Sequence, residues 1–292
     1  MESIKVSVVI PAYNRASYIN QTVDSVLNQT FEDFELIVVD DGSTDGTYEK
    51  LLEYGDKISV LAHEGHTNKG QSASINLGLK QASGKYIAIL DSDDFWELNK
   101  LEIQVAYLEQ NPDIGLVYCN GYGVDSDGQR YYDFYPEDPK ENNDPNRVLL
   151  DCYILLPQNS LVRKKVYDRV GFFNEEYRSA QDHDMLIRIS EVCTFAYLPD
   201  YVFNYRRHEN SISTKKQDVR WTTGFKILEA ASKRYPYKSS TIRKRKAVLN
   251  FRLGQVFIRQ GRYMKALVHI FKAGILDPLR SLKVLLGKEV VN

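Results

Sequence analysis

The first 120 residues alternate between short apolar runs and stretches whose apolar residues recur at helical spacing. The runs occupy residues 6–10, 36–39, 58–62, 86–90 and 114–119, and the amphipathic stretches occupy residues 19–27, 48–52, 70–82 and 98–108. Strands that alternate with helices join through crossovers, so they form parallel neighbours covered by helices. The pattern predicts an α/β fold with a mainly parallel sheet and helices on both faces.

The pattern changes after residue 120. Asp127-Gly128 lies between tyrosine-rich flanks and predicts a hairpin, and further strands are expected at residues 161–163 and 201–206. From residue 217 the spacing is helical, and residues 253–278 match one tetratricopeptide unit. A single unit cannot bury its own apolar face, so a helical hairpin is expected there. We therefore divide the chain into an α/β domain, residues 1–215, and a helical extension, residues 216–292.

The net charge of −1 conceals two oppositely charged parts. Residues 206–292 contain 21 Lys and Arg against 5 Asp and Glu, a net charge of +16, which leaves −17 on residues 1–205. The acidic part could hold a metal ion and the basic part could face phosphates. A solvated helical surface would also explain the basic part, since Lys and Arg are good helix formers.

The chain carries no sequence feature of export or membrane insertion. No apolar run approaches the roughly 18 residues that span a bilayer, and the start of the chain does not resemble a signal peptide. The three cysteines, Cys119, Cys152 and Cys193, are widely spaced and form no C-x-x-C pair, which favours a reducing compartment. We expect a cytoplasmic protein.

Polar clusters follow three of the predicted strands. They are Pro11-Ala12-Tyr13-Asn14-Arg15, Asp40-Asp41 and Asp91-Ser92-Asp93-Asp94. Ligands of parallel sheets bind at the carboxyl ends of the strands, so we expect these clusters to share one edge. One acidic strand end would only cap a helix or form a turn, but five carboxylates at one edge repel each other and favour a bound cation.

The residue types of these clusters restrict the chemistry. The Asp-x-Asp of Asp91 and Asp93 suits Mn²⁺ or Mg²⁺, which prefer oxygen ligands and leave positions open for a diphosphate. Asp41 could accept a hydrogen bond from a base or a ribose. Residues 11–15 contain no glycine, which disfavours a dinucleotide-binding Rossmann fingerprint and a P-loop.

Four segments together resemble the family 2 glycosyltransferases: residues 7–15, 38–47, 68–76 and 84–94, in family order and at family spacing. The resemblance covers about residues 3–215 and implies a GT-A fold, a nucleotide-diphospho-sugar donor and inversion at the anomeric carbon. It implies that residues 11–15 and Asp41 contact the nucleotide, with Pro11, Tyr13 and Asp41 on uridine. Asn68, Gly70 and Asn76 would lie along the nucleotide. Asp91, Ser92 and Asp93 would lie at the ribose and the metal-bound diphosphate, with Asp94 as an alternative metal ligand.

The same resemblance suggests a catalytic base and a closing loop. Asp182 matches the family base, although Gln181 stands where the family usually has Glu, and Asp184 is the alternative base. Residues 206–213 resemble an Arg-x-His-x-x-Ser-x-Ser segment, which makes His208 a candidate metal ligand. Arg206 or Arg207 could offset diphosphate charge.

The sequence says less about the acceptor and the partners than about the donor. Residues 122–135 and 157–160 are where similar enzymes bind a glycan or lipid-linked glycan acceptor. The basic extension could attach the protein peripherally to an anionic membrane or join copies of the chain, and no nucleic-acid module accompanies it. Two other functions remain open: a sugar-1-phosphate nucleotidyltransferase and a non-catalytic module that binds a nucleotide sugar.

Overall fold

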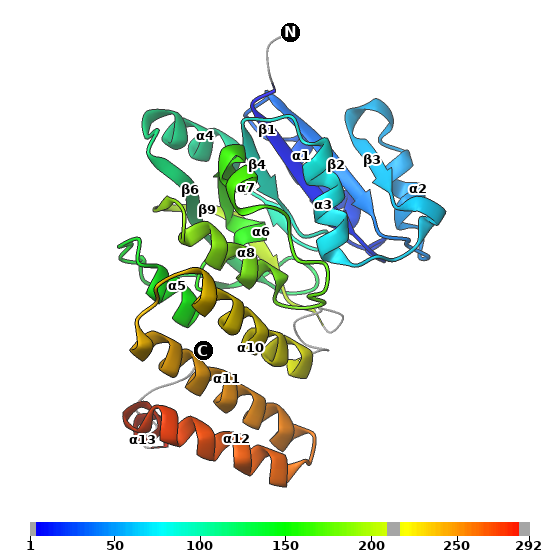
Figure 1. Ribbon diagram of the computed structural model, residues 1–292. Coiled ribbons are helices and arrows are strands. Elements are labelled where there is room, and N and C mark those ends of the chain that lie inside the picture. The colour runs from blue at the N-terminus through cyan, green and yellow to red at the C-terminus, as the bar shows by residue number, and fades with distance from the viewer. Residues whose placement is uncertain (1–3, 209–216, 286–292) are drawn as a thin grey trace. The chain divides into compact units, whose positions relative to one another are not determined.

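The computed structural model describes residues 4–208 and 217–285. The chain forms two compact units (Figure 1). The first unit contains residues 4–143 and 154–208, and the second contains residues 144–153 and 217–285. The two are described separately below.

A nine-stranded sheet forms the centre of the first unit, in the order β3-β2-β1-β4-β8-β6-β9-β5, with β7 paired to β6. The strands are β1 (Val6–Ala12), β2 (Phe34–Asp40), β3 (Ser59–Ala62), β4 (Tyr86–Ile89), β5 (Phe95–Trp96), β6 (Ile114–Val124), β7 (Arg130–Asp133), β8 (Ser160–Arg163) and β9 (Thr194–Arg206). The pairs β3-β2, β2-β1, β1-β4 and β6-β9 are parallel, whereas β5, β7 and β8 pair antiparallel. The mixed α/β fold expected from the sequence is confirmed.

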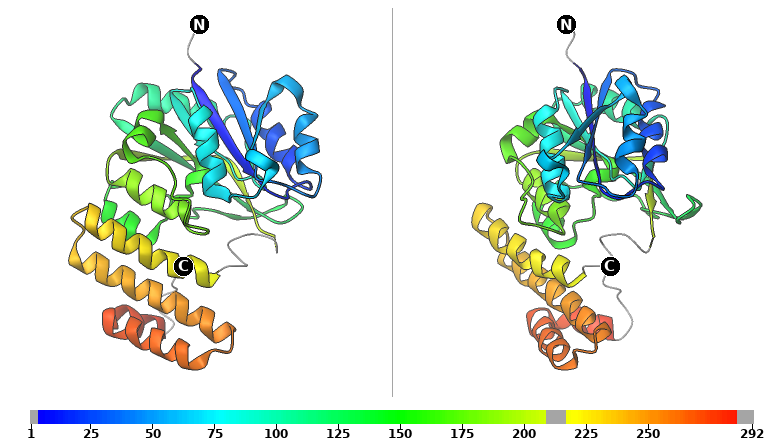
Figure 2. Two further views of the ribbon diagram at one scale, coloured as in Figure 1. Left: turned by 45° about the vertical axis from the view of Figure 1, so that its right-hand side comes forward. Right: turned by 90° about the vertical axis from the view of Figure 1, so that its right-hand side faces the viewer.

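Helices cover both faces of the sheet because successive strand residues point to opposite sides. Val8 and Ile10 of β1 pack in one apolar cluster with Ile19 and Val23 of α1, while Val9 contacts the opposite layer at Gly78 of α3. The helices α1 and α3 accordingly lie on either side of β1 (Figure 2). The helices of this unit are α1 (Ile19–Leu27), α2 (Thr47–Leu52), α3 (Gln71–Gln81), α4 (Lys100–Gln110), α6 (Leu156–Asn159), α7 (Lys164–Val170) and α8 (Gln181–Ser190), with 3₁₀ turns at Gly55–Lys57 and Glu64–His66.

The second unit is helical, as the spacing after residue 217 predicts. It contains α5 (Pro145–Asp151), α10 (Gln217–Arg234), α11 (Ser239–Arg259), α12 (Tyr263–Leu276) and α13 (Pro278–Leu285). The expected hairpin is formed by α11 and α12: Ala266 and Ala273 are buried, and Gly254 admits close contact with Ile270. Although α5 precedes residue 215, it belongs to this unit, where Leu150 accepts a hydrogen bond from Arg245. None of the described helices is long and apolar enough to cross a bilayer.

Candidate active site

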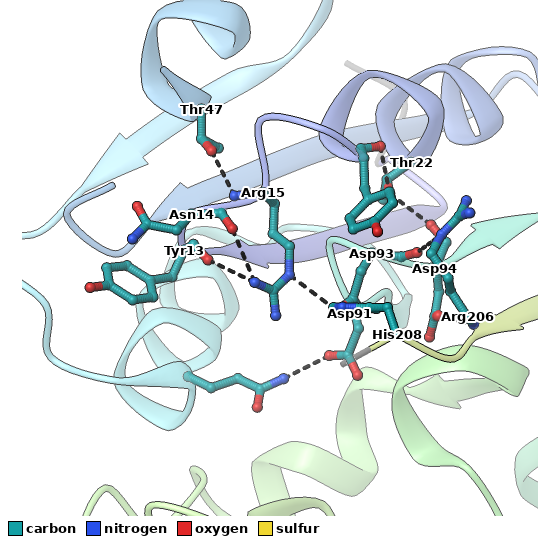
Figure 3. Close-up of polar contacts among 12 residues, drawn as sticks. Tyr13, Asn14, Arg15, Thr22, Thr47, Asp91, Asp93, Asp94, Arg206 and His208 are labelled. Atoms are coloured by element: carbon teal, nitrogen blue, oxygen red, sulfur yellow. Dashed lines mark hydrogen bonds and ion pairs between the residues drawn. The ribbon is translucent and has the colours of Figure 1, made fainter. Parts of the chain in front are cut away.

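The end of β1 projects polar residues toward the third cluster. Tyr13 is 44% exposed, and Asn14 adopts a left-handed conformation with φ of 51°. The Arg15 backbone amide donates to Thr47 Oγ1 at 2.8 Å, which fixes the turn. The Arg15 guanidinium then reaches Asp93, 78 residues further along the chain, with Nε 3.1 Å from Oδ2 (Figure 3). The first and third clusters therefore meet at one edge of the sheet.

The carboxylates of the second cluster fold their own loops. Asp40 Oδ2 accepts from the amides of Gly42 and Ser43 and lies 2.8 Å from His66 Nε2. Asp41 accepts from the backbone amides of Lys69 and Gly70. These donors stabilise both carboxylates. From the sequence we expected five carboxylates to repel each other and favour a cation. In the structure this repulsion comes from three of them, Asp91, Asp93 and Asp94.

Gly70 occupies a position that suits only glycine. Its φ is +95°, in the region that residues with a Cβ rarely adopt. An added Cβ would also lie 2.2 Å from Nη1 of Arg178, which donates to the Lys69 carbonyl. The turn at residues 69–70 is thus fixed by Asp41 on one side and Arg178 on the other, directly before α3. Asn68, the residue before this turn, is exposed.

Asp91 is held by two side-chain amides. Gln71 Nε2 donates to Oδ1 at 2.6 Å and Gln158 Nε2 donates to Oδ2 at 2.5 Å. Burial raises the pKa of Asp91 to about 7, and the charges of Asp93 and Asp182 contribute in the same direction. A perturbed carboxyl among other acids is typical of a functional site.

The two neighbouring carboxyls are perturbed in opposite directions. Burial acts to raise the pKa of Asp93, but the hydrogen bond from His208 and the charge of Arg15 hold it below the ordinary value. Burial raises the pKa of Asp94 well above its ordinary value, and the charges of Asp93 and Asp91 add to this. Asp93 is therefore the more readily ionised of the two carboxyls.

The expected role of Arg206 requires correction. Its side chain is only 3% exposed, and its guanidinium donates to the carbonyls of Asp93 and Ser126 and to Gln21 Oε1. Its backbone amide donates to Asp94 Oδ1 at 2.7 Å. Arg206 therefore supports the acidic cluster from within the protein and does not face a diphosphate. Arg207, the alternative, is exposed and lies over the Tyr132 ring.

Asn76 also has a different role from the expected one. Its amide donates to the Phe173 carbonyl and to Glu175, and its oxygen accepts from the Phe173 amide. The residue is 3% exposed. Asn76 therefore joins α3 to the segment that precedes α8, and its polar atoms do not face a nucleotide.

His208 and Asp93 form the candidate metal position. His208 Nε2 lies 3.0 Å from Asp93 Oδ2. Two ligands about 2.1 Å from an octahedral cation and at right angles to each other are about 3 Å apart, so the pair fits Mn²⁺ or Mg²⁺. The described residues contain no group of three such ligands. A cation held by this pair would keep positions open for diphosphate and water oxygens, as is usual for Mg²⁺. Ser211 and Ser213 of the same motif lie outside the described residues.

The two candidate bases differ in their surroundings. Asp182 lies in the first turn of α8, with its side chain 31% exposed. Asp184 is 5% exposed, and its Oδ2 accepts from Arg188 Nε at 2.9 Å. Arg188 also donates to the carbonyls of Val170 and Phe172, so Asp184 belongs to a structural ion pair. Only Asp182 remains open to a substrate.

Three glutamine amides connect α3, α6 and α8 to Asp91, a role that sequence reasoning did not assign to them. Gln181 donates to Gln71 Oε1 at 2.5 Å, and Gln71 and Gln158 hold the two oxygens of Asp91. Gln181, where the family usually has Glu, therefore connects the start of α8 to Asp91. The departure of Gln181 from the family pattern was the one indication in the sequence.

Comparison with known proteins shows the family of this chain. The profile of glycosyl transferase family 2 matches residues 7–171. The chain belongs to this family. It is 36% identical over 190 residues to an uncharacterized glycosyltransferase of Rickettsia bellii, a match that covers 65% of this chain and 27% of that protein. It is 30% identical over 235 residues to the chondroitin synthase of Escherichia coli. This match covers 80% of this chain and 33% of the synthase.

Solved structures share the fold. S. aureus TarS 1–349 in complex with UDP-GlcNAc superposes with a TM-score of 0.71 at 23% identity, over 94% of this chain and 83% of TarS. The mannosyltransferase PcManGT from Pyrobaculum calidifontis, in complex with GDP-Man and Mn²⁺, gives a TM-score of 0.62 at 19% identity, over 97% of this chain and 79% of PcManGT. The expected GT-A fold is confirmed. The chain spans less than two thirds of the length of the curated relatives above.

Proposed function

We propose that this protein transfers a sugar from a UDP-sugar to a hydroxyl of a glycan or lipid-linked glycan, with inversion at the anomeric carbon. The main support is that three acids, Asp91, Asp93 and Asp182, lie close together in the fold. Asp91 and Asp182 are 91 residues apart in the sequence, yet the charges of Asp93 and Asp182 both act on Asp91. A family member that makes a polysaccharide, chondroitin synthase, and a structural neighbour that binds UDP-GlcNAc indicate the substrate class.

The proposed donor site begins at Tyr13. Its exposed ring at the end of β1 suits stacking on uracil. Arg15 brings positive charge to Asp93, and His208 brings a nitrogen ligand to it. The diphosphate would lie at this position. A divalent cation bound there would stabilise the charge that develops on the leaving diphosphate, by several kcal/mol.

Asp182 is the proposed base. The acceptor oxygen forms a bond to the anomeric carbon as the bond from that carbon to the diphosphate oxygen breaks. The hydroxyl proton passes to the Asp182 carboxylate, because an uncharged hydroxyl is a weak nucleophile. The position of Asp182 in the first turn of α8 stabilises its negative charge through the helix dipole.

The substitution Asp182→Asn tests this assignment. Transfer should fall by roughly 10²–10⁴-fold, the usual contribution of general-base catalysis, while UDP binding stays unchanged because the amide keeps the shape of the carboxylate. Asp168→Asn, at an exposed acid of α7, serves as the matched control. Full transfer by Asp182→Asn would remove Asp182 from the mechanism. A wild-type protein that binds UDP-sugars and transfers to no glycan would instead be a binding module.

The helical unit supports a second proposal, peripheral attachment to the cytoplasmic leaflet of an anionic membrane. Large apolar side chains of α12 and α13, which we together name the apolar face, are 49–77% exposed: Tyr263, Met264, Leu267, Val268, Phe271, Ile275, Leu279 and Leu282. Lys265 and Lys272 of α12 are also exposed. Apolar side chains beside lysines suit the interface of an anionic bilayer. Two copies joined through this face would instead bring like charges together.

A further inference from the structure

A cavity lies between α10 and α11, and every ionisable group that lines it is an arginine. Its volume is about 100 Å³, several times what one water molecule needs. Arg220, Arg252 and Arg259 line it together with Trp221 and the amides of Gln217 and Gln255. All of these residues belong to the helical unit, so the cavity is made without any residue of the proposed donor site.

Neutral groups hold these guanidinium groups in place. Arg220 and Arg252 lie over the Trp221 ring, 5.3 and 5.6 Å from its centroid. Arg259 Nη1 donates to Gln217 Oε1 at 2.8 Å. Such contacts orient a cation but leave its charge in place. The cavity is therefore preorganised and positively charged.

The charges of two cavity arginines, Arg252 and Arg259, are not balanced by an ion pair within the described chain. The Nε atom of Arg252 is buried and has no acceptor among the described residues. Burial lowers the pKa of Arg252, and the charges of Arg220, Arg259, Arg280 and Arg245 lower it further. Like charges packed this closely disfavour the folded state unless an anion joins them.

We propose that this cavity binds a phosphate group. Guanidinium groups match phosphate oxygens with paired hydrogen bonds, which makes arginine the usual residue for this anion. The volume of the cavity matches one tetrahedral anion, and the rest of a bound molecule would extend into solvent. The phosphate could belong to a soluble phosphate ester or to the headgroup of an anionic phospholipid, and the chemistry of recognition is the same.

Thermal unfolding of the full chain with inorganic phosphate tests the site. Phosphate should raise the Tm saturably in the presence of excess UDP, while sodium chloride of equal ionic strength should not. Arg252→Gln should weaken this phosphate affinity at least tenfold, because a hydrogen bond to a charged group is lost. Arg262→Gln, at an exposed arginine outside the cavity, is the matched control. Arg259→Gln, at the exposed end of α11, provides a second variant if Arg252→Gln fails to fold.

Vesicles distinguish the two sources. Binding to phosphatidic acid vesicles that needs Arg252 and is displaced by inorganic phosphate would assign the cavity to a lipid headgroup. Arg252-dependent binding of inorganic phosphate without such displacement would assign it to a soluble phosphate. Two results would overturn the proposal. One is the absence of a phosphate response up to about 50 mM, on the order of the dissociation constant of a weak anion site. The other is an equal phosphate response in wild type and in both cavity variants.

Discussion

Lys100 places a buried amino group at the start of α4. Its side chain has no exposed surface, and its Nζ donates to Gln104 Oε1 and the Ser160 carbonyl and lies 4.3 Å from the centroid of the Trp96 ring. Trp96, Gln104 and Lys100 donate to the carbonyls of three successive residues, 158, 159 and 160. These contacts cap the end of α6 and hold Gln158 against Asp91.

We predict that Lys100 makes stability depend on pH. Burial lowers its pKa from 10.5 to about 7, so above pH 7 the unfolded chain binds more protons than the folded chain. The free energy of unfolding should therefore rise with pH, by up to about 1.4 kcal/mol per pH unit. Urea unfolding at pH 7.0 and 8.5 should show this gain in wild type and a smaller one in Lys100→Met.

The upper limit of pH 8.5 keeps the contribution of two buried thiols small. Burial raises the pKa of Cys119 and the pKa of Cys193 to about 12, so the unfolded thiols ionise first above pH 9 and lower stability there. Parallel pH dependence in wild type and Lys100→Met would show that Lys100 keeps its proton in the folded protein.

At the scale of single residues, sequence and structure differ where burial decides the role. Asp93 and Asp182 could be proposed as candidates from the sequence because they stand at the end of a strand and the start of a helix, as the family pattern requires. Arg206 and Asn76 match the same pattern, but a sequence does not show that their polar atoms are already used inside the protein. Gln71 and Gln158 are separated by 87 residues, and nothing in the segments that contain them indicates a shared partner, so only the folded chain brings them to Asp91.

At the scale of elements, the length of each helix or strand decided whether the sequence could predict it. The apolar runs of β1, β2 and β4 are buried on both faces, and α1 and α4 carry clear helical spacing. Both are strong local patterns. In contrast, β5 has two residues and α6 has four, too few for any periodicity to show. The grouping of α5 with the helical unit depends on long-range contacts that no local pattern reports.

The apolar face of α12 leads to a prediction at the same scale. Tyr263, Leu267, Phe271 and Ile275 recur at every fourth position and so form one ridge. Burial of each large apolar side chain contributes about 1.5–3 kcal/mol. The double variant Leu267→Ser/Phe271→Ser should therefore lose at least tenfold of the affinity for phosphatidylglycerol vesicles in a flotation assay.

The matched control is Leu52→Ser, an exposed leucine of α2 in the other unit. It should float as wild type does. Equal flotation of the double variant and wild type would contradict membrane attachment. If the double variant instead converted a dimer to a monomer in light scattering, the apolar face would join two copies of the chain.

At the scale of the whole molecule, the chain separates two kinds of surface. The α/β unit gathers acidic side chains at one sheet edge, and the helical unit carries the basic and exposed apolar side chains. The charge division in the sequence indicated this separation, because residues 206–292 alone carry +16. The proposed assignment gives nucleotide-sugar chemistry to the first unit and attachment to the second.

Calorimetric titration of UDP in the presence of Mn²⁺ tests the central claim most directly, namely that Asp93 and the acids around it hold a cation and the nucleotide diphosphate. UDP should bind wild type and Asp182→Asn with equal affinity, and chelation of Mn²⁺ should abolish binding. Asp93→Asn should bind at least tenfold more weakly, since it loses a charged metal ligand. Equal UDP affinity in wild type and Asp93→Asn, with and without Mn²⁺, would contradict the assignment of the site.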